Sequence, residues 1–243
     1  MKTNRIIDFD IWRGATVFSM IIFHFFFALN YLKILFINFS STPWVVFGFL
    51  IRVSFLVLVG VSLELSFSNS SSQWSFLKKQ LKRLGVIAAA ALFVSFSTWL
   101  YIPDEFIRFG ILHMIALGGL LLLPLVGNKR RVVLLLICSI FLPFFIGSIE
   151  SNSWGGIVLG SKMEGFRSID WFPIFPWLAW ICFGVLVSGP LKIILKNHPL
   201  VSRETRGVQF FKKLGQNALL VYLVHVPIIM ILLVGVMALE SLV

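Results

Sequence analysis

The residues most able to do chemistry in this sequence are histidines and arginines inside long apolar runs. His24 lies deep in the run that follows Arg13. Because an α-helix turns about 100° per residue, Arg13 and His24 lie within about 20° of each other on one face. Asp10, Gly14 and Tyr31 fall near the same stripe. An ionisable residue in hydrocarbon costs free energy, so the stripe predicts a functional site with a partner nearby. The alternative is a histidine that only bonds a neighbouring backbone.

Arg52 and His113 reach a similar predicted depth from two other apolar runs. At about 1.5 Å per residue, Arg52 lies about 12 Å below Trp44, and His113 lies about 10 Å below the outer end of its run. His24 lies about 21 Å above the inner end of its run, which leaves about 9 Å of a hydrocarbon core roughly 30 Å thick. Independent packing residues have no reason to share a depth. We therefore predict that the three side chains meet in one cavity.

His225 is expected at a lower level, about 12 Å above Asn217. Pro227 follows it, removes one helix hydrogen bond and frees the carbonyl of Leu223, so a bend is expected there. Broken backbone at membrane depth is tolerated where it lines a cavity or a protein interior. A histidine that merely fills the bend is the alternative.

The composition is that of a polytopic membrane protein. The chain has 243 residues, of which 58% are hydrophobic and only 13% are charged, whereas soluble domains are about one quarter charged. Seven apolar runs can cross a membrane, at residues 10–32, 44–67, 82–101, 106–126, 131–148, 172–190 and 216–240. We predict an all-α membrane helix bundle of about seven transmembrane helices, forming a single domain over residues 1–243.

The basic residues predict the orientation of this bundle. Most of the 21 lysines and arginines lie in alternate segments, within 2–13, 78–83, 129–131 and 192–213, and few lie on the opposite side. By the positive-inside rule the N-terminus is cytoplasmic and the C-terminus external, in a multi-pass protein of the cell's inner (plasma) membrane. This bias accounts for most of the net charge of +11, so no nucleic-acid partner is expected. Cys138 and Cys182 match no metal or redox spacing, and no metal site is expected.

The longest outer loop, 149–171, is rich in glycine, aromatic residues and charges of both signs. It is a candidate for binding a polar external substrate, with Asp170 and Trp177 at its end. Asp170 could equally cap the helix that follows, and Trp177 suits an interfacial aromatic belt.

Several segments, taken in order, carry a family resemblance. They are residues 7–14 with His24, 55–62, 107–113, 170–177 and 219–227. Together they resemble the heparan-alpha-glucosaminide N-acetyltransferase catalytic family, in its short bacterial branch. The resemblance covers essentially the whole chain. It implies that acetyl-CoA binds from the cytosol and that the acetyl group reaches a sugar on the far side.

The resemblance also implies a catalytic histidine near the outer end of the first span, which would be His24. In the lysosomal branch the histidine lies in the loop after that span, and residues 38–43 here contain none. Many bacterial members have aspartate where this chain has Ala28, and a serine that often ends the motif near the last span is missing at residues 216–218.

Acyl transfer needs a base with a pKa near neutrality and a cationic group where the oxyanion forms. His24 or His113 could be the base, with Arg52 or Arg108 stabilising charge. The predicted donor-binding residues are Arg13, Asp10, His225 and Arg108, and the predicted acceptor-binding residues are Asp170, Trp177 and Arg108.

Two other classes of protein fit the same residues. In a solute or proton-coupled transporter, the polar cluster would be a midplane binding site, although we find no internal repeat of the kind many transporters show. In a haem protein, a pair such as His24 and His113 would supply axial ligands. The acceptor, the choice between an amine and a hydroxyl, and the oligomeric state, including a possible homo-oligomer, stay open at this level.

Overall fold

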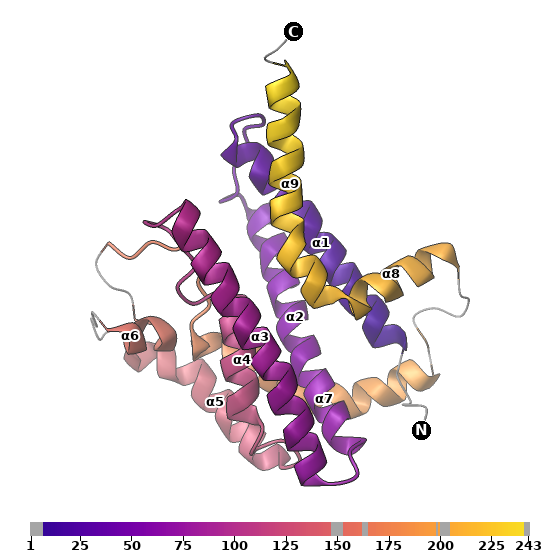
Figure 1. Ribbon diagram of the computed structural model, residues 1–243. Helices are drawn as coiled ribbons and strands as arrows, with labels where there is room; N and C mark the ends of the chain where they lie inside the picture. Colours follow the sequence, from indigo (N-terminus) through magenta and orange to yellow (C-terminus); the bar gives the residue numbers. More distant parts are fainter. Residues whose placement is uncertain (1–6, 147–152, 162–164, 198, 200–204, 241–243) are drawn as a thin grey trace. The chain divides into compact units, whose positions relative to one another are not determined.

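The computed structural model describes residues 7–146, 153–161, 165–197, 199 and 205–240 (Figure 1). Parts of the basic segments 2–13 and 192–213, and parts of the loop 149–171, lie outside these ranges. Within the described ranges the chain forms helices and no strand, which confirms the predicted all-helical fold. The helices are α1 (Ile7–Tyr31), α2 (Thr42–Ser68), α3 (Gln73–Tyr101), α4 (Ile111–Leu122), α5 (Lys129–Ile146), α6 (Trp154–Leu159), α7 (Ile174–Asn197), α8 (Arg206–Gln216) and α9 (Ala218–Glu240).

Five of the described helices are long and apolar enough to cross a membrane, namely α1, α2, α3, α7 and α9. The fourth apolar run forms only the 12-residue helix α4, which rises about 18 Å and is shorter than a hydrocarbon core. The fifth run forms the 18-residue helix α5, whose first three residues are basic. The protein is therefore a membrane-helix protein, while the seven spans and the orientation of the termini stay predictions.

The chain divides into two compact units. The first combines Met1–Phe55 with Ile194–Val243. In it α1 packs against both α8 and α9 (Figure 1). Val17, Met20 and Ile51 form a buried core here, which side chains from α8 and α9, including Leu214 and Val221, help to enclose. This unit therefore places the first and last helices of the chain together.

The second unit comprises Leu56–Ile193. Glycines bring α2 and α7 into backbone contact within it, because a Cβ on Gly60 would overlap the carbonyl of Ile181, and one on Gly184 would overlap that of Val57. Leu178 and Ile181 are fully buried beside this crossing. Helix α3 packs along α4 in the same unit.

Helix α8 is the main difference from the expected fold, since its residues were predicted to belong to an inner loop. Thr205 begins it by accepting a hydrogen bond from the backbone N–H of Val208 on its side-chain oxygen, at 3.3 Å. Its sequence places Val208, Phe211 and Leu214 at helical spacing among polar residues. Eleven amphipathic residues form a stable helix here because that apolar stripe packs on α1.

Candidate functional site

The crossing of α1 and α8 is made by two glycines. A Cβ on Gly14 would overlap the carbonyl oxygen of Phe211, and a Cβ on Gly215 would overlap the carbonyl oxygen of Asp10. The rings of Phe18 and Phe211 meet edge to face at 5.7 Å one turn further along α1. The two backbones are therefore in contact, and α8 holds the first turns of α1 in place.

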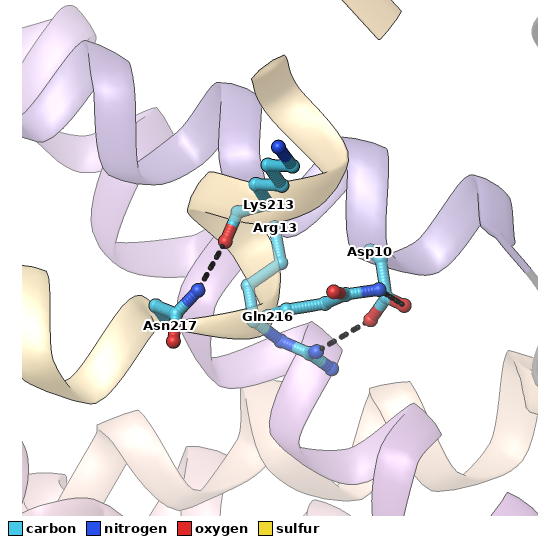
Figure 2. Close-up of polar contacts among 5 residues, drawn as sticks. All are labelled: Asp10, Arg13, Lys213, Gln216 and Asn217. Atoms are coloured by element: carbon cyan, nitrogen blue, oxygen red, sulfur yellow. Dashed lines mark hydrogen bonds and ion pairs between the residues drawn. The ribbon is translucent and has the colours of Figure 1, made fainter. Parts of the chain in front are cut away.

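A polar cluster lies at this crossing (Figure 2). Arg13 pairs with the carboxylate of Asp10 at 3.1 Å, and the side-chain amide of Gln216 donates to the other Asp10 oxygen at 3.4 Å. Asp10 is only 3% exposed. The side-chain amide of Asn217 donates to the carbonyl of Lys213 at 2.9 Å and closes the end of α8. Asp10 and Arg13, which were placed near one polar stripe, are thus joined by an ion pair, with Gln216 as a third member that sequence reasoning did not predict.

His24 and His225 lie side by side, on α1 and α9. Their ring centroids are 4.8 Å apart and their planes are inclined by 77°. The predicted lower level of His225 is therefore wrong. Depth was counted from the first residue of each helix, which assumes that both helices begin at one level. The packing of α8 on α1 sets where α9 begins instead.

In both histidines, Nδ1 is the ring nitrogen that forms a hydrogen bond with a backbone carbonyl of the same helix. Nδ1 of His24 donates to the carbonyl of Met20 at 2.9 Å, and Nδ1 of His225 donates to the carbonyl of Tyr222 at 2.7 Å. A carbonyl oxygen can only accept, so Nδ1 carries the proton in both rings. Each neutral ring therefore has its lone pair on Nε2, the atom that could act as a base.

Arg52 lies in the same unit, on α2. Its Nε donates to the carbonyl of Gly48 at 3.0 Å. The missing side chain at Gly48 leaves room for two neighbours, because a Cβ there would be 3.0 Å from a terminal nitrogen of Arg52 and 3.2 Å from the ring of Phe23. Phe23 is also 5.8 Å from the ring of His24. Arg52 and Phe23 therefore both lie beside Gly48, and Phe23 is in turn a neighbour of His24.

An aromatic cluster surrounds Phe23, and sequence reasoning did not predict it. Its rings lie 4.9–6.2 Å from their neighbours and belong to Phe23, Phe26, Phe27, Phe39, Trp44 and Phe47. These residues come from α1, from α2 and from the loop between them. The 26 phenylalanines in the sequence were the available signal, but composition alone does not say which of them meet.

His113, in the second unit, is held differently. Its Nδ1 accepts the backbone N–H of Gly110 at 3.2 Å, and its Nε2 lies 3.3 Å from the hydroxyl of Ser95. That hydroxyl donates in turn to the carbonyl of Ile107. Both ring nitrogens of His113 therefore have partners, one at the start of α4 and one in α3. The expectation that His113 shares a cavity with His24 and Arg52 stays a prediction.

Asp170 caps a helix, but not the one that follows it in sequence. Its carboxylate accepts the backbone N–H of Ile111, the first residue of α4, at 3.1 Å. Two further bonds tie the same loops together, from Phe172 N–H to the carbonyl of Phe109 at 2.8 Å and from Ile169 N–H to the carbonyl of Glu105 at 2.9 Å. The expected cap of the following helix is therefore corrected to a cap of α4.

Arg108 and Trp177 lie near these loops. Arg108 donates to the carbonyl of Arg167, and its guanidinium carbon is 4.5 Å from the centre of the Phe106 ring. Trp177 packs against Phe172, with ring centroids 4.9 Å apart. Their roles in binding substrate or donor stay predictions, as do those of the other candidate site residues.

The sequence model of one protein family matches most of the chain. The family is described as heparan-alpha-glucosaminide N-acetyltransferase, catalytic, and the match covers residues 5–227. The chain belongs to this family. Among curated proteins and solved structures, no significant match was found. Membership makes this family member a membrane acetyltransferase in general terms, and both His24 and His225 lie within the matched range.

Proposed function

We propose that this family member transfers an acetyl group from cytosolic acetyl-CoA to an amino or hydroxyl group of an extracytoplasmic sugar. The observation that carries the proposal is the position of His24. Its Nε2 is left with a lone pair because Nδ1 is committed to Met20, and it lies well inside α1, a helix long enough to cross the membrane. A base in such a place can serve a substrate that never enters the cytosol.

The chemistry requires little beyond this base and a cation. Nε2 of His24 takes the proton from the amine or hydroxyl as that group attacks the acetyl carbonyl. The guanidinium of Arg52 would stabilise the oxyanion that forms. Arg52 lies beside Gly48, as does Phe23, and Phe23 is a neighbour of His24. The carbon–sulfur bond then breaks, and the departing thiolate takes up one proton to leave as CoA.

The donor would bind near the crossing of α1 and α8. Its phosphates carry negative charge, and arginine binds phosphate through charge-assisted hydrogen bonds. Arg13 is held by Asp10 and is partly exposed, with 21% of its side chain accessible. Asp10 would orient the guanidinium for the donor.

The residues predicted to bind the acceptor, Arg108, Asp170 and Trp177, all lie in the second unit. Arg108 offers a cation and Trp177, in α7, an aromatic surface, and Asp170 ties the segment before α7 to the first residue of α4. We infer an inner-membrane location from the charge bias of the sequence, with the lipid bilayer as the surrounding partner.

The test is transfer across a membrane. Purified protein is reconstituted in lipid vesicles with acetyl-labelled acetyl-CoA on one side and methyl α-glucosaminide or methyl α-glucoside on the other. We expect labelled sugar on the acceptor side and free thiol on the donor side, and the two sugars distinguish an amine acceptor from a hydroxyl acceptor. Uptake of unmodified sugar would support the transporter instead, and a Soret band in the purified protein would support the haem protein.

A further inference from the structure

His225 has a buried nitrogen without a hydrogen-bond partner among the described residues. The residue is 6% exposed, and its Nε2 is the unpaired atom, whereas Nδ1 is bonded to the carbonyl of Tyr222. Buried polar atoms in proteins are normally paired. An unpaired acceptor beside a candidate catalytic residue therefore points to a donor that is present at one stage of the reaction.

His24 is the side chain that can become that donor. Its ring centre is 4.8 Å from that of His225. Because both rings donate through Nδ1, both neutral rings have an acceptor at Nε2, and two acceptors cannot bond each other. Uptake of one proton by His24 turns its Nε2 into a donor. The missing bond in the neutral pair follows directly from its tautomers.

We propose that His24 and His225 act as a two-histidine base that holds one proton. This inference rests on the proposed acetyl transfer. The N–H or O–H bond of the sugar breaks, its proton passes to Nε2 of His24, and Nε2 of His225 accepts a hydrogen bond from it and shares it. When the thiolate leaves, the proton goes to its sulfur and both rings return to neutral. A second proton is excluded because two adjacent cations repel strongly in a low dielectric.

If His225 has only a structural role, an aromatic ring of similar size should replace it without loss of activity. Phenylalanine would preserve a ring against His24 and against Tyr222, whose ring centre is 5.8 Å away. It would also remove the unpaired nitrogen, so it should preserve folding. Only a role in proton transfer needs the lone pair on Nε2.

The experiment compares His225→Phe with Ile229→Ala in the reconstituted full-length protein. Ile229 is 8% exposed and lies one turn further along α9, so its truncation reports a packing defect on the same helix. Turnover is measured with acetyl-CoA and the methyl glycosides, together with thermal stability and the dependence of single-turnover rate on the fraction of D₂O.

We expect His225→Phe to keep its melting temperature and its KM for acetyl-CoA while kcat falls about 10- to 100-fold, part of the range for general-base catalysis. Ile229→Ala should lose stability but keep its kcat per folded protein. In the unmodified protein, a plot of single-turnover rate against D₂O fraction should curve downward, as expected when two protons move in the transition state. In His225→Phe the same plot should be linear.

Several results would overturn the inference. A kcat for His225→Phe within about twofold of normal would do so, as would a linear D₂O dependence in the unmodified protein. So would a loss of turnover that only follows the loss of folded protein. If His24→Ala abolishes transfer while His225→Phe does not, the two-histidine base fails and the proposed function survives. Absence of acetyl transfer by the unmodified protein would overturn both.

Discussion

The histidines that the structure describes differ in whether Nδ1 donates a hydrogen bond to the backbone or accepts one from it. His24 and His225 donate through Nδ1 to carbonyls of their own helices, which leaves Nε2 as a base. His113 accepts a backbone N–H at Nδ1, so its Nε2 carries the proton and faces the hydroxyl of Ser95. His113 in this tautomer caps the start of α4. It must lose its hydrogen bond to Gly110 or to Ser95 before it can serve as a base. Hydrogen bonding thus separates residues that sequence alone treats as equivalent.

His24→Ala should abolish acetyl transfer while leaving binding of CoA largely intact. Loss of a general base typically lowers the rate by about 10²–10⁴-fold, far more than a modest packing defect would. The measurement is turnover in vesicles, with CoA affinity and melting temperature as controls for folding.

His113→Ala is the matched comparison for His24→Ala, because it removes the same side chain from a capping position. It should lower stability by about 0.5–1.5 kcal/mol, the usual worth of a hydrogen bond, with a smaller effect on the rate. If folded His24→Ala keeps near-normal turnover and His113→Ala does not, the base lies on α4.

Arg13→Ala should weaken acetyl-CoA binding about 10- to 100-fold at low salt, the equivalent of one or two charge-assisted hydrogen bonds. Calorimetry at two salt concentrations measures this, because exposed ionic contacts weaken as salt screens them. Lys213→Ala is the control, since it removes an equal charge from a side chain that extends away from the Arg13 guanidinium (Figure 2). Unchanged affinity in Arg13→Ala at both salt concentrations would leave Arg13 as a topology determinant only.

At the scale of elements, the predicted apolar runs located most of the long helices, because hydrophobic length is a local property of the sequence. The limits of α4 were not predictable in this way. Its first residue is fixed by Asp170, which lies 59 positions further along the chain. Helix α8 was missed because its apolar residues are few and it is stable only when packed on α1.

The same limit applies to the candidate site. Arg13 and Asp10 lie three positions apart on one helix, so helical geometry was enough to place them near one stripe. The meeting of His24 with His225 depends on how α9 packs against α1, which no local pattern records. The absence of a hydrogen-bond partner for Nε2 of His225 among the described residues follows from that packing, so the sequence did not predict it either.

Gly14→Ala and Gly215→Ala should each destabilise the protein by about 1–3 kcal/mol, because the added methyl group overlaps a backbone carbonyl across the α1–α8 crossing. Gly85→Ala is the matched control. Gly85 lies within α3 and has nothing within 4 Å of an added Cβ, so alanine there should be neutral or stabilise the helix by up to about 1 kcal/mol. Thermal unfolding in detergent measures all three. A neutral effect of Gly14→Ala would contradict the close backbone contact.

At the scale of the whole molecule, the number of membrane crossings decides on which side of the membrane each loop lies. Five of the described helices satisfy the length and hydropathy that a span requires. Helix α4 is too short alone, but the 19 residues from Gly110 to Asn128 would rise about 27 Å as a helix, close to the core thickness. The basic residues at 129–131 then favour a cytoplasmic start for α5.

Single cysteines at exposed loop positions test the seven-span topology. In a chain with Cys138 and Cys182 replaced, Ser40→Cys and Asp104→Cys should react with an impermeant maleimide on intact cells. Ser71→Cys and Lys129→Cys should react only after permeabilisation, because the positive-inside rule places the loops with most basic residues in the cytoplasm. All four positions are exposed in the structure, so lack of labelling cannot be attributed to burial within the protein. Labelling of Lys129→Cys on intact cells would show that α4 does not cross, and the proposed sidedness of donor and acceptor would then have to change.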